Sequence, residues 1–221
     1  HYLGERDIWG KPGVPVYEPL GHIPLMIAHP GIMPGICDAL TTGVDLFATL
    51  ADLFGADVRQ RTHGKSLLPL LHGETASVRD WLLTGVWGRE VHYVDGRFKY
   101  ARGPVGDNAP LTMMSNRWST MPTHVLTREQ ELPLPDQRAR LDRMPGSSVP
   151  VIHQQWEKGD PVPYWALTRF SGHHLFDLHE DPAEETNLTG TPREAELAER
   201  LRAALTEIEA PKSQFVRLGL G

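Results

Sequence analysis

The spacing of apolar positions predicts two kinds of element in the first third of the chain. Residues 23–28 form an unbroken apolar run, which is typical of a strand buried on both faces of a parallel sheet. Between residues 46 and 54 the apolar side chains recur at one-, three- and four-residue spacings, and Gly55 follows, so we expect a helix that ends there. A strand followed by a helix indicates an α/β layer arrangement.

From Trp81 onward the pattern favours antiparallel strands. Residues 81–87 and 91–94 have strand composition, and residues 97–100 alternate polar and aromatic side chains. Asp95-Gly96 lies between the last two runs and is a preferred two-residue hairpin turn. We therefore expect a hairpin over residues 91–100 with one packed face and one wet face.

The last part of the chain contains one further strand region and one clear helix. Residues 165–178 again have strand composition. Residues 192–209 begin with Pro192 and place leucines on one face at helical spacing, so they predict an amphipathic helix. Residues 103–163 are dotted with prolines, and only a short helix around 136–143 is expected there. Such a stretch is typical of a functional lid, an oligomer contact or an ordered surface excursion.

These patterns place a domain boundary near residue 75. Residues 1–75 would form an α/β part, and residues 76–221 would form an antiparallel part with a packing helix and the long excursion at 103–163.

Composition excludes several classes of protein. The 221 residues carry a formal net charge of −6, which argues against a nucleic-acid partner, because such proteins depend on basic contacts to phosphates. Charged residues at 23% and hydrophobic residues at 40% exclude a disordered polyelectrolyte, and no apolar run is long enough for a membrane span. The single cysteine, Cys37, excludes an internal disulfide and a cysteine-based zinc site.

Lys11 is the first candidate for chemistry. It lies in a glycine-rich loop before the predicted strand at 23–28, where an ammonium group could meet a tetrahedral oxyanion with three donors and a full charge. From spacing alone, an ordinary solvated lysine is the more common interpretation.

Several motifs, in one order along the chain, resemble the C-terminal half of the type I sulfatases, members of the alkaline phosphatase superfamily. The matching segments are Leu3-Gly4-Glu5, Trp9-Gly10-Lys11, Tyr17-Glu18-Pro19, His22 to Leu25, Val44-Asp45-Leu46, Gly64 to Leu71, and Leu175 to Leu188. In the last segment Phe176 stands where the family has tyrosine. The resemblance implies that residues 1–75 are the end of an alkaline-phosphatase-like α/β sandwich, and that residues 76–221 are the smaller antiparallel β-sheet subdomain with its packing helix.

The resemblance also implies roles for two residues. Lys11 corresponds to the family lysine that contacts the sulfate oxygens and the formylglycine, so it is the candidate catalytic residue. His22 lies close by in sequence and is a candidate for substrate binding, although a histidine that caps a strand is as often structural. Tyr17 and Glu18 are more suited to fixing the loop than to touching substrate.

Other parts of the family's machinery are not expected in this chain. The formylglycine precursor lies in Cys/Ser-x-Pro-x-Arg, but Cys37 is followed by Ala39 and Thr41 at the two key positions. Ser148 has Pro150 but Ile152 in place of arginine. The family's calcium, or another divalent metal, would be held by residues upstream of His1, so no metal ligand is expected here. His173, His174 and His179 are a weak alternative metal signal, and surface histidines are the simpler interpretation.

These observations support one main hypothesis and keep others open. The main hypothesis is a C-terminal portion of a sulfate ester hydrolase, inactive by itself. A phosphodiester or phosphonate monoester hydrolase of the same superfamily, or a non-catalytic binding or assembly module, are the alternatives. Because Leu25 and Ile27 would form an open apolar strand edge, we expect an N-terminal half of the same protein, or a second copy, as a partner. The compartment is left open.

Overall fold

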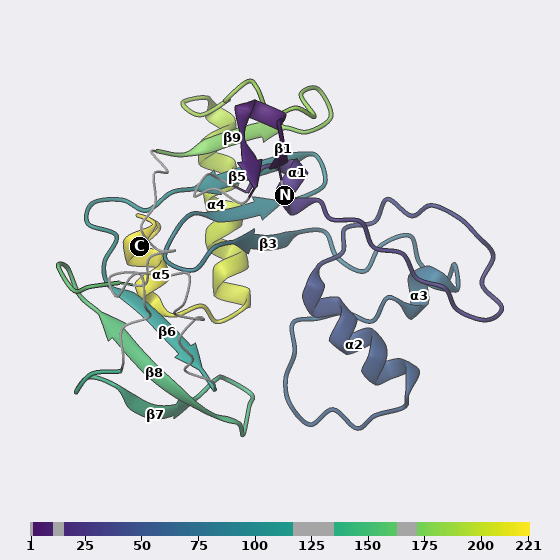
Figure 1. The fold of residues 1–221 in the computed structure, drawn as a ribbon, viewed down its shortest axis with the longest axis horizontal. Coiled ribbons are helices and arrows are strands. Elements are labelled where there is room, and N and C mark those ends of the chain that lie inside the picture. Colours follow the sequence, from purple (N-terminus) through teal and green to yellow (C-terminus); the bar gives the residue numbers. More distant parts are fainter. Residues whose placement is uncertain (1, 11–15, 117–134, 163–171) are drawn as a thin grey trace.

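The computed structural model describes residues 2–10, 16–116, 135–162 and 172–221, and Figure 1 shows their arrangement. The strands are β1 (Tyr2–Leu3), β2 (Trp9–Gly10), β3 (Leu82–Gly85), β4 (Val91–Val94), β5 (Phe98–Arg102), β6 (Leu111–Ser115), β7 (Arg140–Arg143), β8 (Pro150–Trp156) and β9 (His174–Asp177). The helices are α1 (Glu18–Gly21), α2 (Gly43–Leu53), α3 (Leu68–Leu71), α4 (Pro192–Glu207) and α5 (Lys212–Arg217), with a 3₁₀ turn at Glu5–Asp7. No helix in these ranges is long and apolar enough to cross a membrane.

A four-stranded antiparallel sheet in the order β3-β4-β5-β9 forms the centre of the molecule. The predicted hairpin is confirmed, with Tyr93 of β4 opposite Tyr100 of β5. Its turn lies one residue later than expected, because Asp95 N donates to Phe98 O and leaves Gly96 and Arg97 in the loop. Gly96 has φ of 88°, a conformation that glycine adopts at little cost.

Helix α4 packs on one face of this sheet and closes the main hydrophobic core (Figure 1). Pro192 occupies the first turn, and Glu194 accepts a hydrogen bond from the Gly190 backbone N–H at 2.7 Å, which stabilises the helix start. The buried core residues from the sheet, α4 and the C-terminal end share this face; they are Tyr93, Tyr100, Leu175, Leu197, Leu201, Ala204, Leu205, Leu218 and Leu220. The predicted antiparallel part with its packing helix is therefore confirmed.

Part of the 103–163 excursion is a second antiparallel sheet, in the order β6-β8-β7. The helix expected around 136–143 is wrong, because residues 140–143 form β7 and pair with β8, Arg140 opposite His153. Leu141, the leucine of this strand, is 79% exposed. The sheet meets the rest of the molecule where the Trp87 ring lies edge-on to Trp156, with centroids 5.3 Å apart.

The strand expected at residues 23–28 is also wrong. This segment is irregular, and Met26 is 91% exposed. A strand needs a neighbour to complete its backbone hydrogen bonds, and the described part of the chain places none beside it. In Figure 1 the segment runs from α1 as an open loop toward α2 and α3.

Helix α2 is confirmed at residues 43–53, and its first turn has a capping box in which Thr42 N donates to Asp45 Oδ2 at 2.8 Å. The buried side chains of this helix are Asp45 and Thr49, while its apolar side chains face outward. The α/β part predicted for residues 1–75 thus holds helices without a parallel sheet among the described residues, and the boundary near residue 75 stays a prediction.

Candidate functional site

The N-terminal segment lies on the face of the four-stranded sheet opposite α4. Side chains alternate along each strand, so Tyr100 faces the core while Lys99 faces the other side. On that side the Tyr17 ring contacts Phe176 of β9 with centroids 6.0 Å apart. Figure 1 shows β1 and α1 beside the β5–β9 end of the sheet.

Lys99 is the centre of a buried ion triplet between the sheet and this segment. Its Nζ donates a hydrogen bond to Glu18 Oε1 at 3.0 Å. The same Nζ lies 3.0 Å from Glu184 Oε1, and this second contact is an ion pair without hydrogen-bond geometry. The side chains of Lys99 and Glu184 are only 2% and 1% exposed. The Glu18 backbone N–H also donates to Glu184 Oε2 at 2.6 Å. A buried ammonium group is thus matched by two carboxylates, as low-dielectric burial requires.

Arg6 adds a second connection between the same two parts of the chain. Its guanidinium donates to the backbone carbonyls of Ala183 and Glu184, and lies 3.9 Å from the centroid of the Tyr17 ring. The residues that resemble sulfatase motifs near the start of the chain therefore contact the motif near its end.

The 175–188 motif has a local structural reason for its residue types. Asp181 accepts from the Glu185 and Thr186 backbone N–H groups at 3.0 and 2.7 Å, which holds the turn that presents Glu184. Asn187 Oδ1 accepts from Leu175 N at 2.9 Å and ties the turn to β9. These short polar side chains replace backbone partners that the turn lacks.

Two histidines on the covered face of the sheet are shielded from solvent. His92 is fully buried next to Glu90, with 3.6 Å between Nε2 and Oε1. Burial lowers the pKa of His92, and the nearby positive charge of Lys99 lowers it further, while the Glu90 carboxylate opposes this. Burial likewise lowers the pKa of His174.

Of the two site residues predicted from sequence, Lys11 lies outside the described residues. His22 follows α1 with its side chain 80% exposed, and its Nδ1 lies 3.1 Å from Glu18 Oε2. Glu18 therefore contacts both His22 and the buried Lys99 through its two carboxylate oxygens. Cys37 is an exposed free thiol in the loop before α2.

Sequence reasoning missed Lys99, because the hairpin pattern places it on the wet face. The structure corrects this: the N-terminal segment covers that face, so Lys99 is buried. No local signal reveals the burial, since its cause is contact with residues about 80 positions away in sequence.

No group of three or more His, Cys, Asp or Glu side chains suited to a metal ion occurs in residues 2–10, 16–116, 135–162 and 172–221. His173 instead accepts a hydrogen bond from Gly103 N at 3.1 Å. The described residues therefore do not by themselves provide a site for the metal that the resemblance implies for the parent protein.

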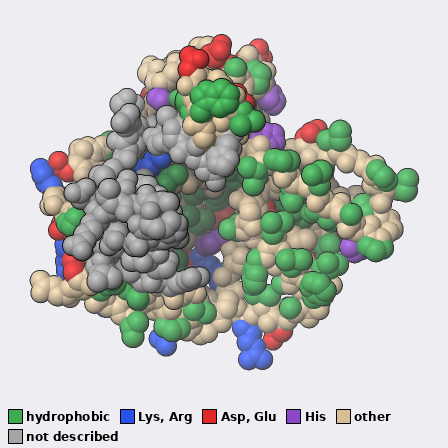
Figure 2. All heavy atoms as spheres, viewed as in Figure 1, with side chains coloured by type: hydrophobic (Ala, Val, Ile, Leu, Met, Phe, Trp, Pro, Cys, Tyr) green, Lys and Arg blue, Asp and Glu red, His purple; other side chains and the backbone are tan. Residues whose placement is uncertain are grey.

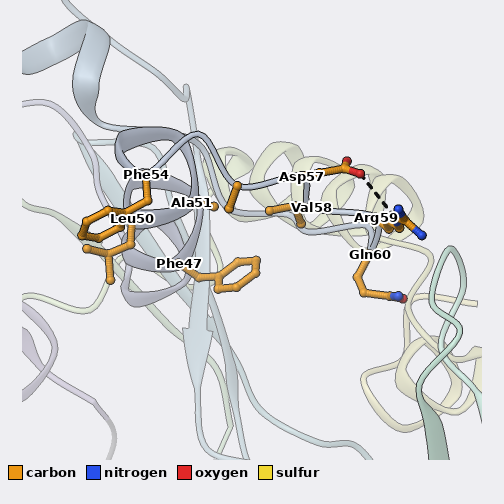
Figure 3. A pocket seen from close by; sticks show the side chains of 9 residues that line it. Phe47, Leu50, Ala51, Phe54, Asp57, Val58, Arg59 and Gln60 are labelled. Atoms are coloured by element: carbon orange, nitrogen blue, oxygen red, sulfur yellow. Dashed lines mark hydrogen bonds and ion pairs between the residues drawn. The ribbon is translucent and has the colours of Figure 1, made fainter.

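An apolar groove lies apart from this cluster, along α2. Phe47, Leu50 and Phe54 project from the helix and, with residues 56–60, line an open hollow of about 520 Å³ (Figure 3). Asp57 and Arg59 form an ion pair at its rim, 3.2 Å apart. Hydrophobic side chains also gather on the surface of the lobe that holds α2 and α3 (Figure 2).

Two curated proteins match parts of the sequence. A choline-sulfatase of Rhizobium meliloti (strain 1021) is 45% identical over 74 residues, which cover 32% of this chain and 14% of that protein. An arylsulfatase K of Xenopus laevis is 30% identical over 105 residues, covering 37% of this chain and 20% of that protein. The aligned part thus spans a fifth or less of either relative. No protein-family model matches the chain.

Among solved structures, a 2-O GAG sulfatase superimposes with a TM-score of 0.37 at 17% identity, over 75% of this chain and 25% of that one. The two sequence matches confirm the resemblance to sulfatases, at partial coverage.

Proposed function

We propose, from the premise that this chain is a sulfatase-family C-terminal portion, that it completes the active site of a sulfate ester hydrolase whose nucleophile lies elsewhere in the protein. The observation that carries the proposal is the contact between the Tyr17-Glu18 motif and the Asp181–Leu188 motif through Lys99. This contact holds Tyr17 and Glu18 against the sheet, and these residues follow the Lys11 segment in sequence.

The chemistry asked of this chain is electrostatic. Transfer of a sulfuryl group to an oxygen nucleophile depends on positioning and on neutralising charge on the sulfate oxygens. Lys11 would supply a fixed positive charge, and His22 would supply a ring nitrogen toward the same group.

The nucleophile and a divalent metal, calcium by resemblance, would come from the upstream part of the protein. A bound metal would polarise the sulfate oxygens. Because the described residues have no suitable ligand cluster, we assign no metal-dependent step to this chain.

The partner we propose is the N-terminal half of the same protein. The exposed apolar groove along α2 and the exposed segment around Ile23 and Met26 present apolar surface of the kind that marks an interaction site. The same surface would otherwise promote association between copies of the chain.

The test measures whether the full-length protein hydrolyses choline sulfate or an aryl sulfate, the two esters that appear in the names of the matched relatives. A phosphodiester and a phosphonate monoester serve as competing substrates. We expect turnover of a sulfate ester, a loss of at least about 100-fold in kcat/KM for Lys11→Ala, and little change for Lys158→Ala, whose side chain is 74% exposed.

The 221-residue chain alone should show no turnover. If the full-length protein preferred the phosphodiester or the phosphonate monoester, a phosphorus ester hydrolase of the same superfamily would replace the sulfatase proposal. Absence of all hydrolysis in the full-length protein would favour a binding or assembly module.

A further inference from the structure

The buried triplet around Lys99 has a consequence for His22. Glu18 uses Oε1 to accept from Lys99 and Oε2 to contact His22 Nδ1, so a single carboxylate links a buried ammonium group to an exposed imidazole. A carboxylate held on one side by a buried cation has little freedom to rotate on the other.

The contact also sets which edge of the His22 ring faces Glu18. Nδ1 lies 3.1 Å from Glu18 Oε2, an ion-pair contact that places this edge of the ring against the carboxylate. The second ring nitrogen, Nε2, then lies on the far side of the ring from Glu18 and is available to a ligand.

The anchor of Glu18 is stronger than that of an ordinary surface pair. Glu184 is buried, accepts from the Glu18 backbone N–H at 2.6 Å and lies 3.0 Å from the Lys99 ammonium. Both the main chain and the side chain of Glu18 are therefore held, and without Lys99 two carboxylates would face each other.

We propose that Lys99 is a positioning residue that holds Glu18 against Glu184, fixes residues 16–22 on the sheet and sets the orientation of the His22 imidazole. One part of the inference rests on the proposed function: that the ligand met by His22 Nε2 is an oxygen of a sulfate ester. The positioning itself is a property of the 221-residue chain.

The experiment measures hydrogen–deuterium exchange and the ¹⁵N shifts of the histidine rings in the 221-residue chain. The variants are Lys99→Met, Lys99→Arg and Glu18→Gln, with Lys158→Met as the control because Lys158 forms an exposed ion pair with Asp107 at 2.9 Å. For Lys99→Met we expect exchange in residues 16–22 to rise at least about 10-fold while α4 stays protected, with a change in the ¹⁵N shifts of the His22 ring. Lys99→Arg should restore part of both signals, and Lys158→Met should change neither.

Glu18→Gln keeps the Lys99–Glu184 pair. It therefore tests the positioning of His22 even if Lys99→Met does not fold. We expect it to alter the His22 ring shifts with the core unchanged. Unaltered His22 shifts in Glu18→Gln, or unaltered exchange at 16–22 in a folded Lys99→Met, would overturn the proposal. In the full-length protein, Glu18→Gln should raise KM more than it lowers kcat. A protein without sulfate ester turnover would defeat the proposed function while leaving the exchange and NMR results to judge the positioning.

Discussion

The ring of Tyr17 is stacked on the imidazole of His174, with centroids 6.5 Å apart and an interplanar angle of 20°. This contact joins the N-terminal segment to β9, and the Arg6 guanidinium covers the same tyrosine ring, 3.9 Å from its centroid. The Tyr17 ring and the Lys99 ion triplet therefore attach one segment to one face of the sheet by different physical means, one through ring contacts and one through charge.

Replacing Tyr17 with alanine should lower the free energy of unfolding by about 1–3 kcal/mol, since it removes a ring pair and a cation–π contact. Tyr17→Phe keeps both and should cost less than about 1 kcal/mol. Urea denaturation of the two variants checks this. Equal losses in both would show that the hydroxyl, rather than the ring, holds the segment.

Arg217 should be far more sensitive to substitution than a surface arginine. It is buried, its Nη1 donates to the Arg89 carbonyl at 2.7 Å, and burial lowers its pKa to about 10. Arg217→Met leaves that buried carbonyl without this donor, so we expect a loss of about 1–3 kcal/mol. Arg202→Met, which removes an exposed pair with Glu199, should cost less than about 0.5 kcal/mol. Thermal and urea unfolding of both variants would contradict this if their losses were equal.

Polar substitutions on α2 should reduce association without reducing stability. Phe47, Leu50 and Phe54 are exposed, so serine at these positions removes apolar surface of which more than half is left uncovered by this chain. We expect the triple variant to scatter less light at high concentration and to bind less hydrophobic dye, with its unfolding midpoint nearly unchanged. Leu201→Ser, in the core, should instead destabilise the chain by at least about 2 kcal/mol. A large loss of stability in the α2 variant would mean that the groove is covered within this chain.

Stability should fall as the pH is lowered from 7.5 to 5.5. The pKa of His92 is lowered by burial, as are those of His173 and His174, so below about pH 6.5 the unfolded chain takes up protons that the folded chain does not. Each such histidine contributes a fall of at most about 1.4 kcal/mol per pH unit. The carboxylates whose pKa is lowered, such as Asp142 and Asp177, lose their contribution to the free energy of unfolding only at more acidic pH.

The measurement is the difference between urea-derived stabilities at the two pH values. His92→Gln should reduce that difference by about 1 kcal/mol whatever its effect at pH 7.5, whereas the exposed His63→Gln should leave it unchanged. A difference that stays the same in His92→Gln would show that the ring is protonated in the folded chain.

The sequence by itself determined the elements whose signals are local. The hairpin at 91–100 follows from alternation around a Gly96 turn, and the helices at 43–53 and 192–207 follow from apolar spacing with capping residues. The motifs that resemble sulfatases also needed no structure, because they are read directly from residue types and their order.

Only the tertiary structure decided the elements and the site that depend on distant neighbours. Residues 23–28 have the composition of a buried strand, yet they are irregular because no described strand lies beside them. Residues 140–143 became a strand because β8 supplies hydrogen-bond partners. Lys99 is buried because Glu18 and Glu184, from opposite ends of the chain, meet over the sheet. The pairing of a buried charge is a property of three-dimensional proximity, which residue type and spacing do not encode.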